Sequence, residues 1–233
     1  MEGEKMVREL LSGLTKGYPS VQQIFATGDW MEGNSDLTRG SGIEVTEATE
    51  QELRKVSNLV TPQKVLALVH IPRADLPVEE LTAGVILGFE AVRDPGNLGT
   101  IIRTADWFGI RHILCSTDSV DQYNPKVVQA TMGAMARVEV HYVDLELLLG
   151  EPSMKNKPVY GTFLGGENIY ETALEENPLI LFGNESQGLS SRFDPFIRTR
   201  LAIPPFAGKQ AGSESLNLAS SVAVVCSEVR RRE

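Results

Sequence analysis

Six short apolar runs, separated by segments with helical patterns, constrain the fold more than any other feature of this sequence. Several of the runs are apolar at successive positions, which is expected of strands that are covered on both faces of a sheet. The runs follow one another from Gly84 onward and read GVILGFE, RHILCS, RVEVHYV, KPVYGTF, PLILFG and RLAIP. Their alternation with helices predicts an α/β fold built on a mostly parallel sheet.

Composition divides the chain into three parts. Residues 1–72 form one unit, residues 73–83, with Pro77 and several charges after Pro72, read as a linker, and residues 84–233 carry the six runs. In the first part, MVRELLSGL predicts a helix and KVLALVHIP a strand, whereas the Gly- and Asp-rich TGDWMEGNSDLTRGSG is expected to be an irregular connection. A short strand and a helix capped by Thr46 or Thr49 are predicted before the KVLALVHIP strand.

Charge and hydropathy exclude several classes of protein. The 233-residue chain has a formal net charge of -9, which argues against the large basic surface of many nucleic-acid-binding proteins. No apolar stretch approaches the roughly 18–20 residues of a membrane span, and the charged N-terminus lacks the apolar block of a signal peptide. We therefore expect a cytoplasmic protein with no membrane partner.

The cysteines and histidines do not show the pattern of a metal site or a disulfide framework. Cys115 and Cys226 each lie in an apolar run, so they are expected to be reduced core thiols. The histidines, His70, His112 and His141, do not have the spacing of zinc ligands. The sequence therefore predicts no metal.

The segment DPGNLGTIIRTADWFGI, directly after the first run, is the first candidate for a functional element. Asn97 is a good N-cap and Gly109 a good stop, which predicts a helix over residues 98–108. The face expected to pack on the sheet carries Leu98, Ile101, Ile102, Ala105 and Phe108. Arg103 points the other way together with Trp107, and a tryptophan there indicates burial against a further surface. The alternative is a solvent-exposed arginine beside an incidental tryptophan.

The turn GNESQG is the second candidate. A buried strand over residues 179–182 leads directly into this polar turn, in which Glu185 stands between Gly183 and Gly188. Open α/β sheets bind ligands where strands end, but this turn is neither a dinucleotide-binding loop, a Walker loop nor a nucleophile elbow. Its carboxylate would repel a phosphate and favours a cationic or hydroxyl-rich ligand. The alternative is that Glu185 only accepts amide hydrogen bonds at a helix start.

The C-terminal segment AIPPFAGKQAGSESLNLASSVAVVCSEVRRRE is the third candidate. A strand is expected to end at Ile203, and Ser213 or Ser215 to cap a helix whose apolar face turns to the core. Capping explains Ser215 but not Asn217, because asparagine is a mediocre helix former in a first turn. Asn217 is therefore a candidate functional residue.

Together, the three segments resemble the three sequence motifs of the TrmH (SpoU-type) branch of the SPOUT RNA methyltransferases, and the resemblance covers residues 84–233. NLGTIIRTADWFG resembles the first motif, LILFGNESQGLS the second and IPPFAGKQAGSESLNLASSVA the third. The resemblance implies a SPOUT-type α/β trefoil knot, a feature that general folding rules do not derive. Residues 1–72 resemble the small α+β, ribosomal-protein-like substrate-binding domain that precedes the knotted domain, with either a shortened start or a smaller size.

The resemblance also implies a homodimeric enzyme that transfers a methyl group from S-adenosylmethionine to a ribose 2′-hydroxyl of tRNA or rRNA, without a metal. The residues that match the family's catalytic positions are Asn97, Arg103, Glu185, Ser215 and Asn217. Those that match its cofactor-binding positions are Thr162, Leu164, Gly183, Asn184, Gly188, Ile203 and Leu216. A guanidinium keeps its proton in proteins, so Arg103 is expected to bind phosphate and stabilise the developing alkoxide instead of acting as a base.

Two alternatives stay open at this point. The first is a catalytically silent RNA- or ribosome-binding protein of the same fold, and the joint presence of all five catalytic-position residues counts against it. The second is a nucleotide-dependent α/β enzyme, and the lack of a phosphate loop counts against that one. Basic residues near the expected site predict a local positive groove on an acidic protein: Arg103, Arg192, Arg198, Arg200 and Lys209.

Overall fold

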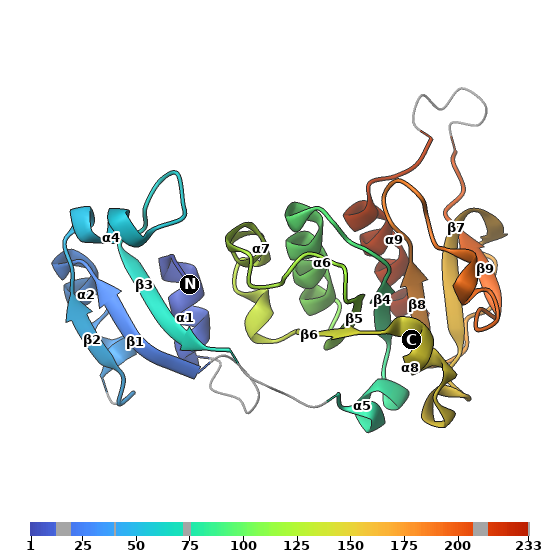
Figure 1. Ribbon diagram of the computed structural model, residues 1–233, viewed down its shortest axis with the longest axis horizontal. Coiled ribbons are helices and arrows are strands. Elements are labelled where there is room, and N and C mark those ends of the chain that lie inside the picture. The colour runs from blue at the N-terminus through green and yellow to red at the C-terminus, as the bar shows by residue number, and fades with distance from the viewer. Residues whose placement is uncertain (13–19, 40, 72–75, 207–213, 233) are drawn as a thin grey trace.

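The described strands form two sheets, which lie in different parts of the molecule (Figure 1). The computed structural model describes residues 1–12, 20–39, 41–71, 76–206 and 214–232. Within these ranges, the first part of the chain forms a three-stranded sheet and the remainder a six-stranded sheet. None of the described helices is long and apolar enough to cross a membrane.

The six-stranded sheet contains all six strands that the apolar runs predict. Its order is β6-β5-β4-β8-β7-β9, and each neighbouring pair is parallel. The prediction of an α/β fold with a mostly parallel sheet is therefore confirmed. The strands are β4 (Ile86–Phe89), β5 (His112–Ser116), β6 (Glu139–Val143), β7 (Val159–Asn168), β8 (Leu179–Phe182) and β9 (Thr199–Ala202).

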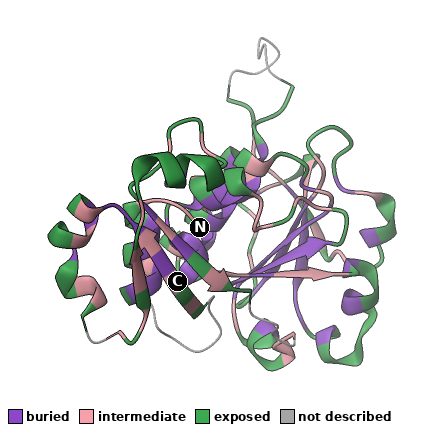
Figure 2. Cartoon of the chain, turned by 60° about the vertical axis from the view of Figure 1, so that its left-hand side comes forward, coloured by how far each residue is buried: buried purple, intermediate pink, exposed green. Residues whose placement is uncertain are grey.

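Helices cover both faces of this sheet. Successive side chains of each strand point to opposite faces, so both faces present apolar side chains that the helices bury. In β8, Ile180 and Phe182 pack in one apolar layer, whereas Leu179 and Leu181 pack in the other. The central strands β4, β5 and β8 are buried at every position, and Figure 2 shows buried strands in this sheet. Burying one such side chain contributes about 1.5–3 kcal/mol, so the two layers are a main source of stability. The first layer holds α6 (Pro95–Trp107), α7 (Pro125–Thr131), η1 (Ala134–Ala136) and α9 (Leu218–Arg231), and the second holds α5 (Val78–Ala83), α8 (Leu145–Gly150), η2 (Pro152–Met154) and η3 (Ser191–Phe193).

The three-stranded sheet has the order β2-β1-β3, with β1 parallel to β2 and antiparallel to β3. Strands β2 and β3 confirm the predictions, but β1 was not predicted. A register shift between Val21 and Gln23 interrupts the alternation of side chains in β1, which hides the strand from a period-two pattern. The elements of this part are α1 (Glu4–Ser12), β1 (Ser20–Ala26), α2 (Gly28–Gly33), α3 (Ser35–Thr38), β2 (Glu44–Glu47), α4 (Glu50–Val56) and β3 (Val65–His70).

Two regions predicted to be irregular contain short helices. The segment TGDWMEGNSDLTRGSG includes α2 and α3, and the Thr27 side chain caps α2 by accepting a backbone N–H of that helix. The expected linker contains α5, whose Leu81 is buried in the second apolar layer. Of the two caps proposed for α4, Thr49 is the one observed, and it forms a capping box with Glu52.

A polar contact joins α1 to the six-stranded part of the chain. Arg137 Nε and Nη2 each donate to Asp106 at 2.8 Å, and Nη1 pairs with Glu9 of α1. These hydrogen bonds, that to Asp106 foremost, raise the pKa of Arg137 above its ordinary value. Buried apolar residues of α1 also belong to the first layer, so α1 packs on the same core as α6.

Both cysteines are buried and reduced, as predicted. Cys115 lies in β5 and Cys226 in α9. Burial raises the pKa of each thiol to about 12. Neither thiol is therefore a nucleophile at neutral pH.

Candidate active site

Three segments that lie far apart in the sequence meet through the side chains of Asn97, Glu185 and Asn217. Asn97 Nδ2 donates to Glu185 Oε1 at 3.0 Å, and Asn217 Nδ2 donates to Asn97 Oδ1 at 2.9 Å. Glu185 and Asn217 are exposed and Asn97 is half-buried, so a ligand can reach this junction. The structure thus brings together one residue from each of the three candidate motifs, with Asn97 in the centre.

The start of α6 sets the position of Asn97. Asp94 is the N-cap of this helix, and its Oδ1 accepts the backbone N–H of Asn97 at 2.7 Å. The predicted helix is confirmed, but the prediction that Asn97 caps it is wrong, because the helix starts at Pro95. Pro95 explains the earlier start, because proline is favoured at the first position of a helix. As a result, the Asn97 side chain is available to the other two segments.

The predicted core face of α6 is mostly confirmed. Its buried residues include Leu98, Ile101, Ile102 and Ala105. Phe108 is half-buried and follows the helix as its C-cap. Gly109, the predicted stop, adopts a positive φ of 65° directly after it.

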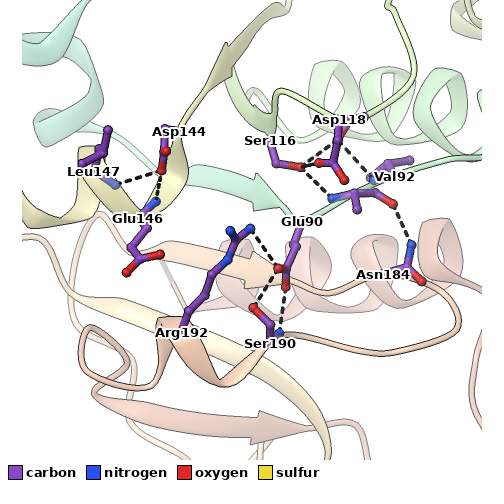
Figure 3. A network of polar contacts seen from close by, with 12 residues as sticks. Glu90, Val92, Ser116, Asp118, Asp144, Glu146, Leu147, Asn184, Ser190 and Arg192 are labelled. Atoms are coloured by element: carbon purple, nitrogen blue, oxygen red, sulfur yellow. Dashed lines mark hydrogen bonds and ion pairs between the residues drawn. The ribbon is translucent and has the colours of Figure 1, made fainter.

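The connection between β4 and α6 is held from two sides (Figure 3). Ser116 Oγ accepts the backbone N–H of Ala91 at 2.7 Å, and Asn184 Nδ2 donates to the Ala91 carbonyl at 2.8 Å. Ala91 has a φ of 53°, a left-handed conformation that is unfavourable for a residue with a Cβ. These hydrogen bonds offset that cost and connect the segment before α6 to the Glu185 turn.

The turn after β8 is closed by its own backbone. Asn184 and Gly188 exchange backbone hydrogen bonds of 3.0 and 2.9 Å. A Cβ on Gly183 would lie 2.0 Å from backbone atoms across the turn, and Gly188 has a φ of +71°. Both glycines are therefore required by the turn itself. Glu185 projects from it toward Asn97, and no helix starts directly after it whose amides it could cap.

The start of α9 places Asn217. Asn217 is the N-cap of this helix, since its Oδ1 accepts the backbone N–H of Ser220 at 3.3 Å. The prediction of a serine cap is therefore wrong for Ser215, which lies two residues before the cap and is exposed, and Ser213 lies outside the described residues. Asn217 has two roles, because its oxygen caps the helix while its Nδ2 donates to Asn97.

The far end of α9 is also fixed to α6. Arg230 Nε donates to the carbonyl of Phe108 at 2.8 Å, and Arg230 Nη2 to the carbonyl of Gly109 at 3.2 Å. Cations are favourable at this end of α6, where the helix dipole is negative. The two helices are thus joined at both ends, which sets Asn217 relative to Asn97.

Glu90, directly after β4, is a buried carboxylate that sequence reasoning missed. Its oxygens accept the backbone N–H and the hydroxyl of Ser190, each at 2.7 Å, and Arg192 Nη2 lies 3.0 Å from Oε1 (Figure 3). Glu90 is only 9% exposed, and a buried carboxylate is costly unless hydrogen bonds and an opposite charge compensate it. Glu90 thereby ties β4 to the segment that follows the Glu185 turn. The available signal was an acidic residue at the end of the otherwise apolar run GVILGFE.

Arg103 lies apart from the junction. It is exposed on α6, six residues after Asn97, which corresponds to about 9 Å along the helix axis. It lines a groove of about 580 Å³ together with Trp107, α1 residues and Ala223 of α9. Trp107 is 84% exposed, so the predicted burial of this side chain is not met within one chain.

The residues at predicted cofactor-binding positions lie mainly toward the carboxyl ends of neighbouring strands. Thr162 follows the β7–β8 ladder, Gly183 follows β8 and Ile203 follows β9, and these three strands are neighbours. Open α/β sheets bind ligands beyond such carboxyl ends. Leu164 and Leu216 are 77% and 53% exposed, which leaves apolar surface for a ligand to cover. Backbone groups and apolar side chains fit the adenosine part of S-adenosylmethionine.

The predicted positive groove is not supported, because most of its arginines are ion-paired. Arg192 pairs with Glu90 at 3.0 Å, Arg198 with Glu175 at 2.6 Å and Arg200 with Asp194 at 2.8 Å. Lys209 lies outside the described residues. Arg103 differs from the other three arginines. In the described part of the chain, no carboxylate lies within ion-pair distance of its guanidinium.

Comparison with known proteins identifies one family. A model described as the SpoU rRNA Methylase family matches residues 84–227. Over 231 residues, the chain is 29% identical to the 23S rRNA (guanosine(2553)-2′-O)-methyltransferase RlmP of Bacillus subtilis, which covers 99% of this chain and 87% of that protein.

Solved structures are similar over the whole chain. A protein from Porphyromonas gingivalis, assigned to the TrmH family of RNA methyltransferases, has a TM-score of 0.82 at 36% identity and covers 100% of this chain and 89% of its own. An AdoMet-bound rRNA methyltransferase from Sinorhizobium meliloti has a TM-score of 0.82 at 26% identity, with 100% and 86% covered.

Proposed function

The chain belongs to the SpoU rRNA methylase family, and we propose that the junction of Asn97, Glu185 and Asn217 is part of the site at which it methylates RNA. The chain is an S-adenosylmethionine-dependent RNA 2′-O-methyltransferase, like the relatives that match it over nearly its full length. The observation that carries the placement of the site is the convergence of three distant motifs in one hydrogen-bonded junction.

The residues of the chain act in this proposal by alignment. When bound, S-adenosylmethionine supplies a methyl group on a sulfonium, so that a C–S bond breaks as a C–O bond to the ribose forms and the hydroxyl proton is released. The amides of Asn97 and Asn217, with Ser215 beside them, orient the ribose. Glu185 holds Asn97 in position, while the backbone around Gly183 binds the cofactor. Apolar contacts to the cofactor come from Leu164, Ile203 and Leu216, and polar or backbone contacts from Thr162, Asn184 and Gly188.

Arg103 completes the site of the partner protomer in the same proposal. As a guanidinium with a fixed fork of donors, it binds the phosphate next to the target ribose and stabilises the developing alkoxide. Two observations support a homodimer packed through α6 and α9: the exposed Trp107 and the groove beside Arg103. A site shared between protomers explains why Arg103 stands apart from Asn97 within one chain.

The finer features of the fold also belong to this proposal. In this proposal residues 84–233 form a trefoil knot, as the resemblance of the three motifs implies, and the start of α9 lies beside the start of α6 in it. Residues 1–72 bind RNA, and residues 73–83, which include α5, connect them to the catalytic part. The protein acts in the cytoplasm, and rRNA is the favoured substrate class because the Bacillus subtilis relative is named for 23S rRNA.

Methyl transfer to RNA from a strain that lacks the protein tests this proposal. We expect labelled methyl from S-adenosylmethionine to appear at a ribose 2′-oxygen, and Asn97→Ala or Asn217→Ala to slow transfer at least tenfold. Calorimetry with the cofactor accompanies the assay. Cofactor and RNA binding without transfer would indicate a catalytically silent binding protein, and a lack of cofactor binding would reject the placement of the cofactor site.

A further inference from the structure

A second polar cluster lies at the other end of the sheet strands, where β5 and β6 begin. His112 and Glu139 are the first residues of these two strands and face each other in the ladder, and His141 lies two residues further along β6. The spacing of the histidines in the sequence predicts no metal site, but the parallel pairing of β5 and β6 brings these side chains together. The length of β5 places the cluster about 13 Å from the carboxyl ends of the strands.

The three side chains present their ligand atoms to one point. His112 Nδ1 lies 3.1 Å from His141 Nε2, and Glu139 Oε2 lies 3.9 Å from each of these nitrogens. The nearest point equidistant from the three atoms lies in their plane, about 2.1 Å from each, which is the length of a zinc–nitrogen or zinc–oxygen bond. The imidazoles are 6% and 9% exposed and the carboxylate 19%, so the atoms are largely removed from water.

The surroundings of the cluster match those of a metal site. Glu80 Oε2 lies 3.1 Å from His112 Nε2, and an ionised carboxylate only accepts, so His112 donates from Nε2 and keeps a lone pair on Nδ1. Metal-bound histidines commonly donate their second ring N–H to a carboxylate in this way. Arg111 Nη2 bonds Glu139 Oε1 at 3.2 Å, which leaves Oε2 directed at the histidines.

Charge in the cluster also suits a cation. The carboxylates of Glu80 and Glu139 both pair with the guanidinium of Arg111, whose Nη1 lies 3.6 Å from Glu80 Oε2. Two negative groups thus share one positive group.

We propose that His112 Nδ1, His141 Nε2 and Glu139 Oε2 bind a divalent transition-metal ion, with zinc as the best match to two imidazoles and one carboxylate. Three protein ligands leave a fourth position for water. The ion joins β5 to β6 and, through Glu80, holds α5 against the sheet. It stabilises the fold and takes no part in methyl transfer, because the junction of Asn97 and Glu185 follows the opposite ends of the strands.

Zinc titration of the full chain, after removal of metals with a chelator, tests this proposal. We expect one zinc ion per chain with micromolar or tighter affinity, measured by competition with a chromophoric chelator, and a higher melting temperature with zinc. Cobalt in place of zinc should give the intense visible absorption of a four-coordinate site without thiolate-to-cobalt bands, which excludes Cys115 and Cys226 as ligands.

Matched variants identify the ligands. His141→Asn and Glu139→Gln should each weaken zinc binding by more than tenfold, and Glu80→Gln by 10- to 100-fold. His70→Asn, which changes an exposed histidine of β3 outside the cluster, should leave the affinity unchanged. If zinc does not bind stoichiometrically, or binds both ligand variants as tightly as the original chain, the proposal is wrong. The cluster is then only a hydrogen-bonded chain from Glu80 through His112 to His141, with Glu139 paired to Arg111.

Discussion

Asn97 Nδ2 donates a hydrogen bond to Glu185 Oε1 at 3.0 Å, although the two residues are 88 positions apart in the sequence. The bond joins the first turn of α6 to the tip of the turn after β8. Asn97 also accepts from Asn217, so its amide is fully oriented by the two neighbouring segments. Gly183 and Gly188 therefore close the turn that follows β8, and the Glu185 carboxylate holds the side-chain amide of Asn97 at the centre of the junction.

Replacing Glu185 with alanine should slow methyl transfer while leaving the fold intact. The bond to Asn97 orients the amide that positions the ribose, and loss of this alignment should lower the rate roughly 10- to 100-fold. Because Glu185 is exposed, we expect an unchanged melting temperature. Glu185→Gln keeps an acceptor for Asn97 and should be intermediate. Turnover of Glu185→Ala equal to that of Ser186→Ala, a neighbouring control on the same turn, would contradict the assigned role.

The strands of the larger sheet could be predicted because they are short runs that are apolar on both faces, as β8 illustrates. The caps could not be assigned in the same way. Asp94 and Asn97 are both good N-caps, and the decision between them depends on Pro95, which fits the first helical position. The dual role of Asn217, as cap and as donor to Asn97, depends on how α9 packs on α6, and no local pattern specifies that packing.

The residues that the sequence did not reveal are those defined by strand order. Glu90 becomes a buried partner of Ser190 because β4 and β8 are neighbours. His112 and His141 meet because β5 and β6 are neighbours. Residue spacing along the chain contains no information about which strands pair, so the convergence of the three motifs was also predicted only through the family resemblance.

Gly183→Ala should disrupt the Glu185 turn. The added Cβ would lie 2.0 Å from backbone atoms of Gly188 and Leu189, which cannot move away as a flexible side chain can. We expect a loss of about 1–3 kcal/mol in the free energy of unfolding and weaker cofactor binding, measured by denaturant titration and calorimetry. Gly165→Ala is the matched control, since a Cβ there has no atom within 4 Å. Equal stability of the two variants would show that the turn opens at little cost.

Trp107→Glu should dissociate the proposed homodimer. A charge at a side chain that is 84% exposed in the single chain costs nothing in the monomer but is unfavourable in an apolar interface. Sedimentation velocity should show a monomer with an unchanged circular dichroism spectrum, and methyl transfer should be lost because Arg103 no longer reaches the partner's site. Leu147→Glu, on the exposed side of α8 and 70% exposed, should remain dimeric and active. A monomeric original chain at micromolar concentration would refute the shared site.

Glu228→Gln should make the protein less stable at neutral pH and less sensitive to acid. Hydrogen bonds from Arg231, and next those from Arg232, lower the pKa of Glu228 from 4.5 to about 2. Because the folded-state pKa is depressed, the stabilisation is fully present above pH 4.5 and is lost as the pH falls toward 2. Arg232 also donates to the carbonyls of Thr172 and Ile169, so the Glu228 cluster fixes the end of α9 to the segment after β7.

The size of this effect distinguishes a buried cluster from a surface ion pair. The Glu228 side chain is 5% exposed, but Arg231 is open to solvent, so we expect a loss of about 1–2 kcal/mol at pH 7 in urea titrations. Between pH 4.5 and 2, the variant should lose stability less steeply than the original chain. Glu175→Gln breaks an exposed pair with Arg198, in which the carboxylate is 58% exposed, and should change stability by less than about 0.5 kcal/mol. Equal losses in both variants, or parallel acid-unfolding curves for Glu228→Gln and the original chain, would mean that the α9 cluster contributes no more than a solvent-exposed pair.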